Sequence, residues 1–577
     1  MSAAIFTAPL LSVERLSIQF GAQRVVDDVS FALWPGKTLC IAGESGSGKS
    51  LTSLAIMGLL PEEAQIPGGA IIFANQDLLS LPERQMQLLR GKSMAMIFQE
   101  PMTSLNPLMT VGQQLEETLQ RHEALGRRER RIRVSTMLDA VKLSHVEKRL
   151  QQYPHELSGG MRQRVMIAMA MLCQPQVLIA DEPTTALDVT IQAQILDLMR
   201  ELQQEFSTSL LLITHDMGVV AEMADDVLVM NHGNIIEQAP VETLFTAPQQ
   251  PYTRQLLQAV PVLGQAPALA PVAQTQPLLS VRDLCVRFPV RGDGLRVRRE
   301  VHAVEGVSFD LFPGETLGIV GESGCGKSTT AKALMNMVPF SGSARLNGQE
   351  LHGLQGEALR SVRRDLQMVF QDPWAALNPR KTIFELVGEP LLIHEQLPVL
   401  RRRERVAQLL QQVGLPAEAM QRYPHQFSGG QRQRICIARA LALNPKVIIA
   451  DESVSALDVS VQAQVLALLE DLRLRHQLSY LFISHDMAVV ERICHRVAVM
   501  FGGQIVEIGP RDRVLRHPQH PYTRHLLSAV PMPKVAHKRE PRIASAMPER
   551  PDPIKPLGWQ SAQQRFTDFG DGHLAAC

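Results

Sequence analysis

The sequence predicts an α/β fold in two copies, each a mainly parallel sheet core with a helical subdomain inserted into it. The first observation is an internal repeat, since GESGSGKS at 43–50 returns as GESGCGKS at 321–328. The second is an alternation of short apolar runs, such as VLIADE and LLLITH, with longer helical patterns, which is typical of parallel sheets. The third is a stretch rich in Glu, Gln, Arg and Leu between MIFQEPMTSLNP and YPHELSGG, which predicts the inserted helices.

The repeat also predicts how the 577 residues divide into domains, because from Ser158 onward the second copy follows the first at a constant offset of 270 residues. Residues 263–277 (LGQAPALAPVAQTQP) carry no charge and no strand or helix period, which is typical of a short extended linker. After Pro531 the chain is rich in Pro, Lys and Arg without clear periodicity. We therefore expect a first domain over 1–262, a linker over 263–277, a second domain over 278–531 and an irregular tail over 532–577.

Charge and composition argue against several classes of protein. Lys plus Arg and Asp plus Glu both number 58, so no global basic field attracts nucleic acid, and we expect no nucleic-acid partner. No apolar run approaches the roughly 20 residues that cross a bilayer, and the start of the chain lacks the basic flank of a signal peptide. The seven cysteines are scattered without a CxxC pair, which predicts reduced structural thiols.

Two glycine-rich segments match the phosphate-loop pattern GxxxxGK[ST], each between an apolar strand and a helical run. Glycines let the backbone N–H groups face phosphates, and the following helix points its positive end at the same anion. The lysine reaches the terminal phosphates, and the hydroxyl after it can ligate Mg²⁺. We predict ATP and Mg²⁺ as cofactors of two P-loop NTPase domains. The predicted loop contacts are Gly43, Ser45, Gly46, Gly48, Lys49 and Ser50, and Gly321, Ser323, Gly324, Gly326, Lys327 and Ser328.

A pair of carboxylates follows an apolar strand in each copy, Asp181–Glu182 after QVLIA and Asp451–Glu452 after KVIIA. Such a pair alone is more often a solvated loop, but beside a phosphate loop it predicts catalysis. The Asp would hold Mg²⁺, and the Glu, turned to the opposite face by the strand period, would act as general base on the attacking water.

A histidine and a glutamine of each copy lie at or just after the end of a predicted strand. His215 and His485 each end an apolar strand, where an imidazole can contact the γ-phosphate and hold the base and water in line; a lone strand-end His is usually structural, but its recurrence favours function. Gln99 and Gln371, in FQEP and FQDP, are predicted to sense both Mg²⁺ and a neighbouring surface, with a capping amide as the alternative. The predicted metal ligands are Ser50, Gln99, Asp181, Ser328, Gln371 and Asp451.

An SGG segment precedes a helical run in each copy. The serine would cap the helix, and the glycines would bare its N-terminus for an anion. A single SGG is more often a simple turn. The residues concerned are Ser158, Gly159 and Gly160, and Ser428, Gly429 and Gly430.

The flanked segments LSGGMRQR and FSGGQRQR resemble the signature sequence of ATP-binding cassette ATPases, and the resemblance covers about residues 11–531. It implies that Asp188 and Asp458 match the D-loop. It also implies that Phe20 and Phe288 stack on adenine, with a core Phe as the alternative.

Members of that family close two cassettes head to tail, so that ATP lies between one phosphate loop and the other signature. The resemblance thus implies a first site of Lys49, Asp181, Glu182 and His215 with Ser428 and Gly430. It implies a second site of Lys327, Asp451, Glu452 and His485 with Ser158 and Gly160. Both sites keep the Glu, so both are expected to hydrolyse ATP, although Ser453 replaces the usual Pro in the second.

The extensions PYTRQLLQAVP and HPYTRHLLSAVP are similar to those of the dipeptide and oligopeptide importer ATPases. This resemblance implies peptide import, with glutathione as one candidate cargo. It implies two membrane permease subunits, a periplasmic substrate-binding protein reached through them, and a peripheral position on the cytoplasmic face of a bacterial inner membrane. Relatives often ligate an iron-sulfur cluster after this segment, but only Cys577 follows the second copy, so no cluster is expected.

Two other classes remain open at this point. Soluble twin-cassette ATPases of translation or DNA repair also carry two such domains, but their linkers usually bear basic helices or zinc cysteines, and this linker is short and uncharged. A small-molecule kinase with a phosphate loop leaves the paired signatures unexplained.

Overall fold

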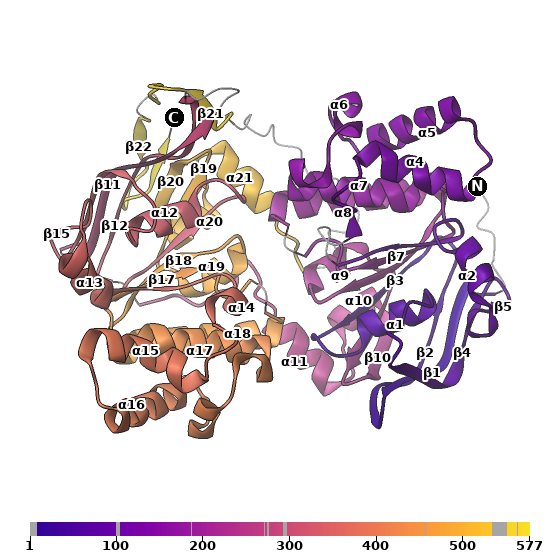
Figure 1. The fold of residues 1–577 in the computed structure, drawn as a ribbon, viewed down its shortest axis with the longest axis horizontal. Coiled ribbons are helices and arrows are strands. Elements are labelled where there is room, and N and C mark those ends of the chain that lie inside the picture. The colour runs from indigo at the N-terminus through magenta and orange to yellow at the C-terminus, as the bar shows by residue number, and fades with distance from the viewer. Residues whose placement is uncertain are drawn as a thin grey trace. The chain divides into compact units, whose positions relative to one another are not determined.

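A computed structural model describes residues 8–99, 104–185, 187–270, 272–273, 276–291, 297–455, 457–533, 551–561 and 564–576. The chain divides into two compact units, shown in Figure 1. The first comprises Met1–Leu187, Ile191–Val260 and Pro531–Pro541, and the second Asp188–Thr190, Pro261–Val530 and Arg542–Cys577.

The first unit contains two sheets. An antiparallel sheet has the order β2-β1-β4-β5, and a mainly parallel sheet has the order β10-β9-β3-β8-β7-β6, with only the β9–β10 pair antiparallel. The strands are β1 (Leu11–Phe20), β2 (Gln23–Leu33), β3 (Thr38–Gly43), β4 (Ala64–Phe73), β5 (Gln76–Asp77), β6 (Met94–Ile97), β7 (Val177–Asp181), β8 (Ser209–Thr214), β9 (Asp226–Asn231) and β10 (Asn234–Pro240).

The central strand β3 is buried along its whole length, because both faces of the parallel sheet are covered. Its side chains alternate between two cores. Cys40 and Ala42 belong to the core shared with the helical subdomain, whereas Leu39 and Ile41 belong to the core shared with the antiparallel sheet. This alternation places the end of β3, where the phosphate loop begins, between two packed layers.

The helices of the first unit include the inserted helical subdomain, which confirms that prediction. Helices α4, α5 and α6 gather beside α7 in Figure 1, and their apolar side chains, such as Leu115 and Leu138, share one core with Ile167 of α7. Thr110 and Gln113 cap α4 reciprocally. The helices are α1 (Lys49–Ile56), α2 (Glu83–Leu89), α4 (Val111–His122), α5 (Arg127–Ala140), α6 (Val146–Leu150), α7 (Gly159–Met171), α8 (Val189–Phe206), α9 (Met217–Met223), α10 (Val241–Thr246) and α11 (Pro251–Ala259), with 3₁₀ turns at Leu78–Ser80 and Pro154–Glu156.

The second unit repeats the architecture of the first with longer sheets. One sheet has the order β15-β14-β11-β12-β21, and the other β16-β17-β18-β13-β19-β20-β23-β22. The strands are β11 (Leu279–Arg291), β12 (Val297–Leu311), β13 (Thr316–Val320), β14 (Ser341–Leu346), β15 (Gln349–Glu350), β16 (Leu366–Val369), β17 (Val447–Asp451), β18 (Ser479–Ile483), β19 (Arg496–Phe501), β20 (Gln504–Pro510), β21 (Ile554–Pro556), β22 (Phe566–Asp568) and β23 (Leu574–Ala576).

Its helices likewise include a subdomain, in which α15, α16 and α17 lie together in Figure 1. The helices are α12 (Lys327–Leu334), α13 (Gly356–Asp365), α14 (Pro373–Ala376), α15 (Ile383–Glu395), α16 (Val399–Gln412), α17 (Gly429–Leu441), α18 (Val459–His476), α19 (Met487–Ile493), α20 (Arg511–Arg516) and α21 (Pro521–Ser528), with 3₁₀ turns at Ala417–Gln421 and Pro424–Gln426. None of the helices in the part of the chain that the structure describes is both long and apolar enough to span a bilayer.

The prediction of an irregular tail over 532–577 is wrong for three short segments. β21 pairs with β12, and β23 pairs with β20 and β22, so the tail extends both sheets of the second unit. A buried ion pair accompanies the second junction, with His573 Nε2 2.7 Å from Glu507 Oε1. Unpaired backbone at a sheet edge attracts any strand that can complete its hydrogen bonds, so these strands form without strong periodicity of their own. Residues 534–550 of the predicted tail lie outside the described part.

Candidate nucleotide-binding sites

Each phosphate loop connects the end of a buried strand to the first residue of a helix. Gly43 closes β3 with a φ of 150°, and a Cβ at this position would lie 2.2 Å from the Met230 carbonyl oxygen. Gly48 precedes α1 with a φ of 96°. Only glycine fits both requirements, close approach and a left-handed backbone, which explains the spacing of glycines in the pattern.

The loop lysines are buried and lie on the loop backbone. Lys49 Nζ donates to the carbonyl oxygens of Gly43 and Glu44, both at 2.7 Å, and Lys327 Nζ makes the corresponding bonds to Gly321 at 2.7 Å and Glu322 at 3.0 Å. The loop therefore holds each ammonium group within its own curl. This is the position from which a lysine can serve bound phosphates.

The hydroxyl after the loop lysine and the first carboxylate of the pair meet in both units. Ser50 Oγ donates to Asp181 Oδ1 at 3.1 Å, and Ser328 Oγ to Asp451 Oδ1 at 2.9 Å. Burial raises the pKa of Asp181 to about 6, and the charge of Glu182 adds to this while the Ser50 bond opposes it. A small set of hard oxygen donors, with a carboxylate that lacks a full countercharge, fits Mg²⁺.

The second carboxylate reaches the site by a route that the sequence did not predict. Glu182 lies beyond the end of β7 and has a φ of 48°, so the strand alternation invoked for it does not apply; Glu452 repeats this with a φ of 44°. This left-handed residue turns the chain, and the carboxylate faces the neighbouring strand end instead of the opposite face of the sheet. Such strain is found where a site requires it.

Three groups of the first unit converge on the Glu182 carboxylate. His215 Nδ1 lies 3.0 Å from Oε1, and Gln99 Nε2 and Thr185 Oγ1 each donate to Oε2 at 2.9 Å. Burial raises the pKa of Glu182, but the His215 and Thr185 bonds and the Lys49 charge outweigh it, so the pKa lies below its usual value. The group is therefore ionised at neutral pH and held in one orientation.

The second unit repeats the cluster with looser spacing at the histidine. His485 Nδ1 lies 3.5 Å from Glu452 Oε1, Gln371 Nε2 donates to Oε2 at 2.7 Å, and Lys327 Nζ lies 4.0 Å from Oε1. Burial lowers the pKa of His485, but the bond and the charge of Glu452 outweigh this and raise it. Both glutamines thus contact the glutamate through their amide nitrogens, while their role as metal ligands stays a prediction.

The two SGG segments form helix caps as predicted. Ser158 Oγ accepts from Met161 N at the start of α7, and Ser428 Oγ accepts from Gln431 N at the start of α17. The first glycine of each segment is exposed, so an anion can approach the N-terminus of a helix 13 residues long.

The comparisons with known proteins agree with this geometry. The family described as "ABC transporter" matches residues 26–185 and 304–455, which is more than half of the chain. The chain belongs to the ABC transporter family. Its two units are therefore ATP-binding cassettes, and the chain is an ATPase. The fold class predicted from the sequence is confirmed.

A second family, "Oligopeptide/dipeptide transporter, C-terminal region", matches residues 236–285 and 506–556 of this ABC chain. The chain is 51% identical to the "Glutathione import ATP-binding protein GsiA" of Pectobacterium atrosepticum and 53% identical to that of Escherichia coli K12, with 98% of this chain and 96% of each relative covered. A solved dimeric ATP-binding cassette bound to ADP and Pi is 27% identical, covers 40% of this chain and 98% of that chain, and has a TM-score of 0.37. The two family matches and the identity to the two import proteins do not favour the translation or DNA-repair class.

The remaining predicted contacts of the ABC chain lie on strands, before helices and within the phosphate loops. Phe20 is the last residue of β1 and is half-buried, and Phe288, in β11, is 36% exposed, so neither is a fully buried core residue. Asp188 and Asp458 directly precede α8 and α18. Ser45, Gly46, Ser323 and Gly324 lie within the curls of the phosphate loops, and Gly46 and Gly324 have φ values of 79° and 74°.

Sequence reasoning did not name Thr185, which donates to Glu182, and it did not predict that Gln99 contacts the same carboxylate. The signal was a hydroxyl three residues after the glutamate, in DEPTT. In the second cassette Ser455 Oγ donates instead to the Glu452 backbone oxygen at 2.9 Å, so the two glutamates differ in their side-chain partners.

Proposed function

We propose that this chain is the energy-coupling subunit of a bacterial importer for peptides, with glutathione as the first cargo to test. The observation that carries the proposal is the 51 to 53% identity, over 98% of the chain, to proteins named for glutathione import. The match of both PYTR-containing regions to the oligopeptide and dipeptide transporter family supports the wider class of cargo.

We further propose that ATP is hydrolysed by positioning and charge. Ser50, Asp181 and Gln99 would hold Mg²⁺ in one cassette, and Ser328, Asp451 and Gln371 in the other; bound there, the ion would neutralise phosphate charge. Lys49 and Lys327 bind the terminal phosphates. Glu182 and Glu452 accept a proton from the attacking water, and His215 and His485 keep each glutamate aligned, at 3.0 and 3.5 Å.

Each site is proposed to be completed by the other cassette. The helices α7 and α17 begin at Ser158–Gly160 and Ser428–Gly430, where Gly159 and Gly429 are exposed, and a helix N-terminus of this kind can bind an anion. In this proposal the first phosphate loop meets Ser428, Gly429 and Gly430, and the second meets Ser158, Gly159 and Gly160, with Asp188 and Asp458 alongside. Phe20 and Phe288 stack on the adenine rings.

The membrane partner is proposed to dock beside the glutamine that contacts each catalytic glutamate. In the second cassette a cavity of about 670 Å³ lies next to Gln371, and Met337, Phe370 and Ile393 line it together with Lys332. Met337 and Ile393 are 50% and 48% exposed, and apolar side chains that gather at one cavity are a feature of protein-interaction sites. Two permease subunits and, through them, a periplasmic binding protein would place the chain on the cytoplasmic face of the inner membrane.

Reconstitution tests this proposal. The chain is combined in proteoliposomes with its permeases and binding protein, and phosphate release is measured with glutathione, other di- and oligopeptides, or no cargo. We expect peptide to stimulate hydrolysis and to accumulate across the membrane, and a Lys49→Ala, Lys327→Ala double variant to do neither. Stimulation by a nonpeptide solute alone would reject peptide import, and stimulation by longer peptides but not glutathione would reject the narrower cargo.

A further inference from the structure

The linker after the first cassette is held by two buried charged side chains of the second unit. Glu491 Oε2 accepts a hydrogen bond from Gly264 N at 2.6 Å, and Arg511 Nη1 donates to the Pro267 carbonyl oxygen at 3.1 Å. Glu491 is 1% exposed and Arg511 is 5% exposed. Leu263 packs against the core of the same unit. The linker that the sequence presented as a spacer therefore has a built seat on α19 and α20.

Burial of these two charges is costly unless their polar atoms are satisfied. A carboxylate removed from water loses its hydration, and only strong hydrogen bonds or ion pairs can offset that loss. Here the backbone N–H of the linker, at 2.6 Å, supplies such a bond. Gly264 adopts a φ of 88° at this point, which lets the chain turn its N–H inward. The seat and the linker thus depend on each other.

Glu491 lies on α19, the element that follows His485, and Arg511 is the first residue of α20. Asp486 caps α19 by accepting from Ala488 N at 2.9 Å and Val489 N at 3.1 Å. Glu491 follows five residues later, about 7.5 Å along a helix of ordinary rise. Arg511 Nη1 also donates to the Glu491 backbone oxygen at 2.8 Å, so one guanidinium joins the linker to α19. A helix this short moves as one piece, so a displacement at Glu491 reaches His485.

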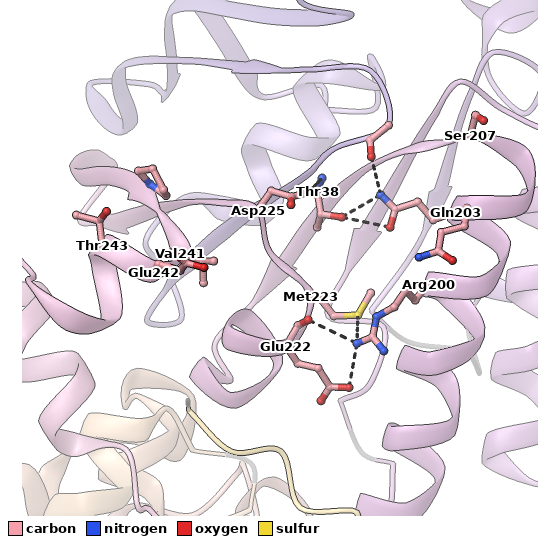
Figure 2. A pocket seen from close by; sticks show the side chains of 13 residues that line it. Thr38, Arg200, Gln203, Ser207, Glu222, Met223, Asp225, Val241, Glu242 and Thr243 are labelled. Atoms are coloured by element: carbon pink, nitrogen blue, oxygen red, sulfur yellow. Dashed lines mark hydrogen bonds and ion pairs between the residues drawn. The ribbon is translucent and has the colours of Figure 1, made fainter. Parts of the chain in front are cut away.

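The first cassette lacks these two side chains. At the offset of 270 residues, Ala221 of α9 replaces Glu491 and Val241 of α10 replaces Arg511. A cavity of about 810 Å³ lies there instead, lined by Arg200, Glu222, Val241 and Glu242 among others (Figure 2). Within it Arg200 Nη2 lies 3.2 Å from Glu222 Oε1, so the charges pair with each other. The two copies therefore differ in sequence at the two positions that hold the linker in the second unit.

We propose that Glu491 and Arg511 are positioning residues of the second ATP site, which tie α19 and thereby His485 to the linker. This rests on the proposed role of His485 beside Glu452. The His485 Nδ1 to Glu452 Oε1 distance, 3.5 Å against 3.0 Å for the first pair, is the quantity that the linker sets. Hydrolysis at the second site then depends on the linker through Glu491 and Arg511, whereas Ala221 and Val241 occupy these positions in the first cassette.

The test uses Glu491→Ala in the full chain, with Glu491→Gln as the conservative variant and Arg492→Ala as a control on the same helix. Each variant is combined with Glu182→Gln, so that only the second site keeps its catalytic glutamate, or with Glu452→Gln, so that only the first site keeps its catalytic glutamate. Hydrogen exchange of peptides covering 261–270 and 487–493 reports the seat itself. Steady-state phosphate release gives kcat and KM for ATP.

We expect Glu491→Ala to speed exchange in both peptides and to lower kcat about 2- to 30-fold in the Glu182→Gln background, with KM unchanged. The Glu452→Gln background should not respond, Glu491→Gln should recover most of the loss, and Arg492→Ala should resemble the parent. Unchanged exchange, faster exchange with unchanged kcat, or an equal fall in both backgrounds would each overturn the proposal. If Glu182→Gln and Glu452→Gln each hydrolyse ATP at the parent rate, the roles assigned to the two glutamates are wrong, which is a failure of the proposed function. In that case the linker role is judged from Glu491→Ala in the otherwise unchanged chain, and an unchanged kcat there would overturn it.

Discussion

Replacement of Glu182 by Gln separates binding of ATP from its hydrolysis at the first site. The carboxylate accepts from Gln99 and Thr185 at one oxygen and contacts His215 at the other. A glutamine keeps the shape and one acceptor oxygen, but its amide nitrogen must face one of these three groups. The variant therefore loses both the negative charge and part of its orientation, while Lys49 and the phosphate loop are untouched.

The expected fall in the rate of ATP hydrolysis follows from the loss of a general base. Removing such a group typically costs 10²- to 10⁴-fold, which is about 2.7 to 5.5 kcal/mol on the barrier. The upper part of this range is expected, because three partners hold the Glu182 carboxylate in place. Nucleotide affinity should change by less than about threefold, since the loop contacts remain.

The assay measures phosphate release and binding of a fluorescent ATP analogue for Glu182→Gln, Glu452→Gln and the double variant. The double variant should bind ATP, retain it and release almost no phosphate. Thr185→Val is a matched variant that removes one contact and keeps the carboxylate, and it should lose far less activity. Near-parent hydrolysis by the double variant would show that the glutamates are not the bases, and loss of binding would show that they serve the fold.

Three further outcomes are expected. Gly48→Ala should abolish ATP binding at the first loop, because its φ is 96° and a Cβ would lie 2.9 Å from a Val26 methyl carbon, and retained binding in a filter assay would contradict this strain. His495 accepts a hydrogen bond from Thr316 N at 3.0 Å, and burial lowers its pKa from 6.5 to about 4. Because folding favours the neutral imidazole, the free energy of unfolding should fall by about 1 to 2 kcal/mol as the pH drops from about 6.5 toward 4. Urea titrations would measure this fall, which should be smaller in His495→Asn. His573→Ala should cost about 1.5 to 3 kcal/mol by leaving the buried Glu507 carboxylate without one partner, and should speed proteolysis of the tail; an unchanged cleavage rate would mean that β23 does not depend on this pair.

The sequence by itself determined the parts whose chemistry is local. The phosphate loops could be predicted because glycine spacing, lysine and serine all act within eight consecutive residues, and in the structure Lys49 bonds the loop backbone while Ser50 bonds Asp181. The SGG caps are local for the same reason, since Ser158 acts on an N–H three residues away.

Only the tertiary structure decided the parts that depend on distant partners. The direction of Glu182 follows from a left-handed backbone that no strand period predicts, and its partners Gln99 and His215 come from two other strand ends. The tail strands form because β12 and β20 offer them an edge. The linker seat joins residues 227 positions apart, and Glu491 gave no sign of it within α19. Such contacts arise from which surfaces the folded chain brings together, and a sequence pattern records only what neighbouring residues do.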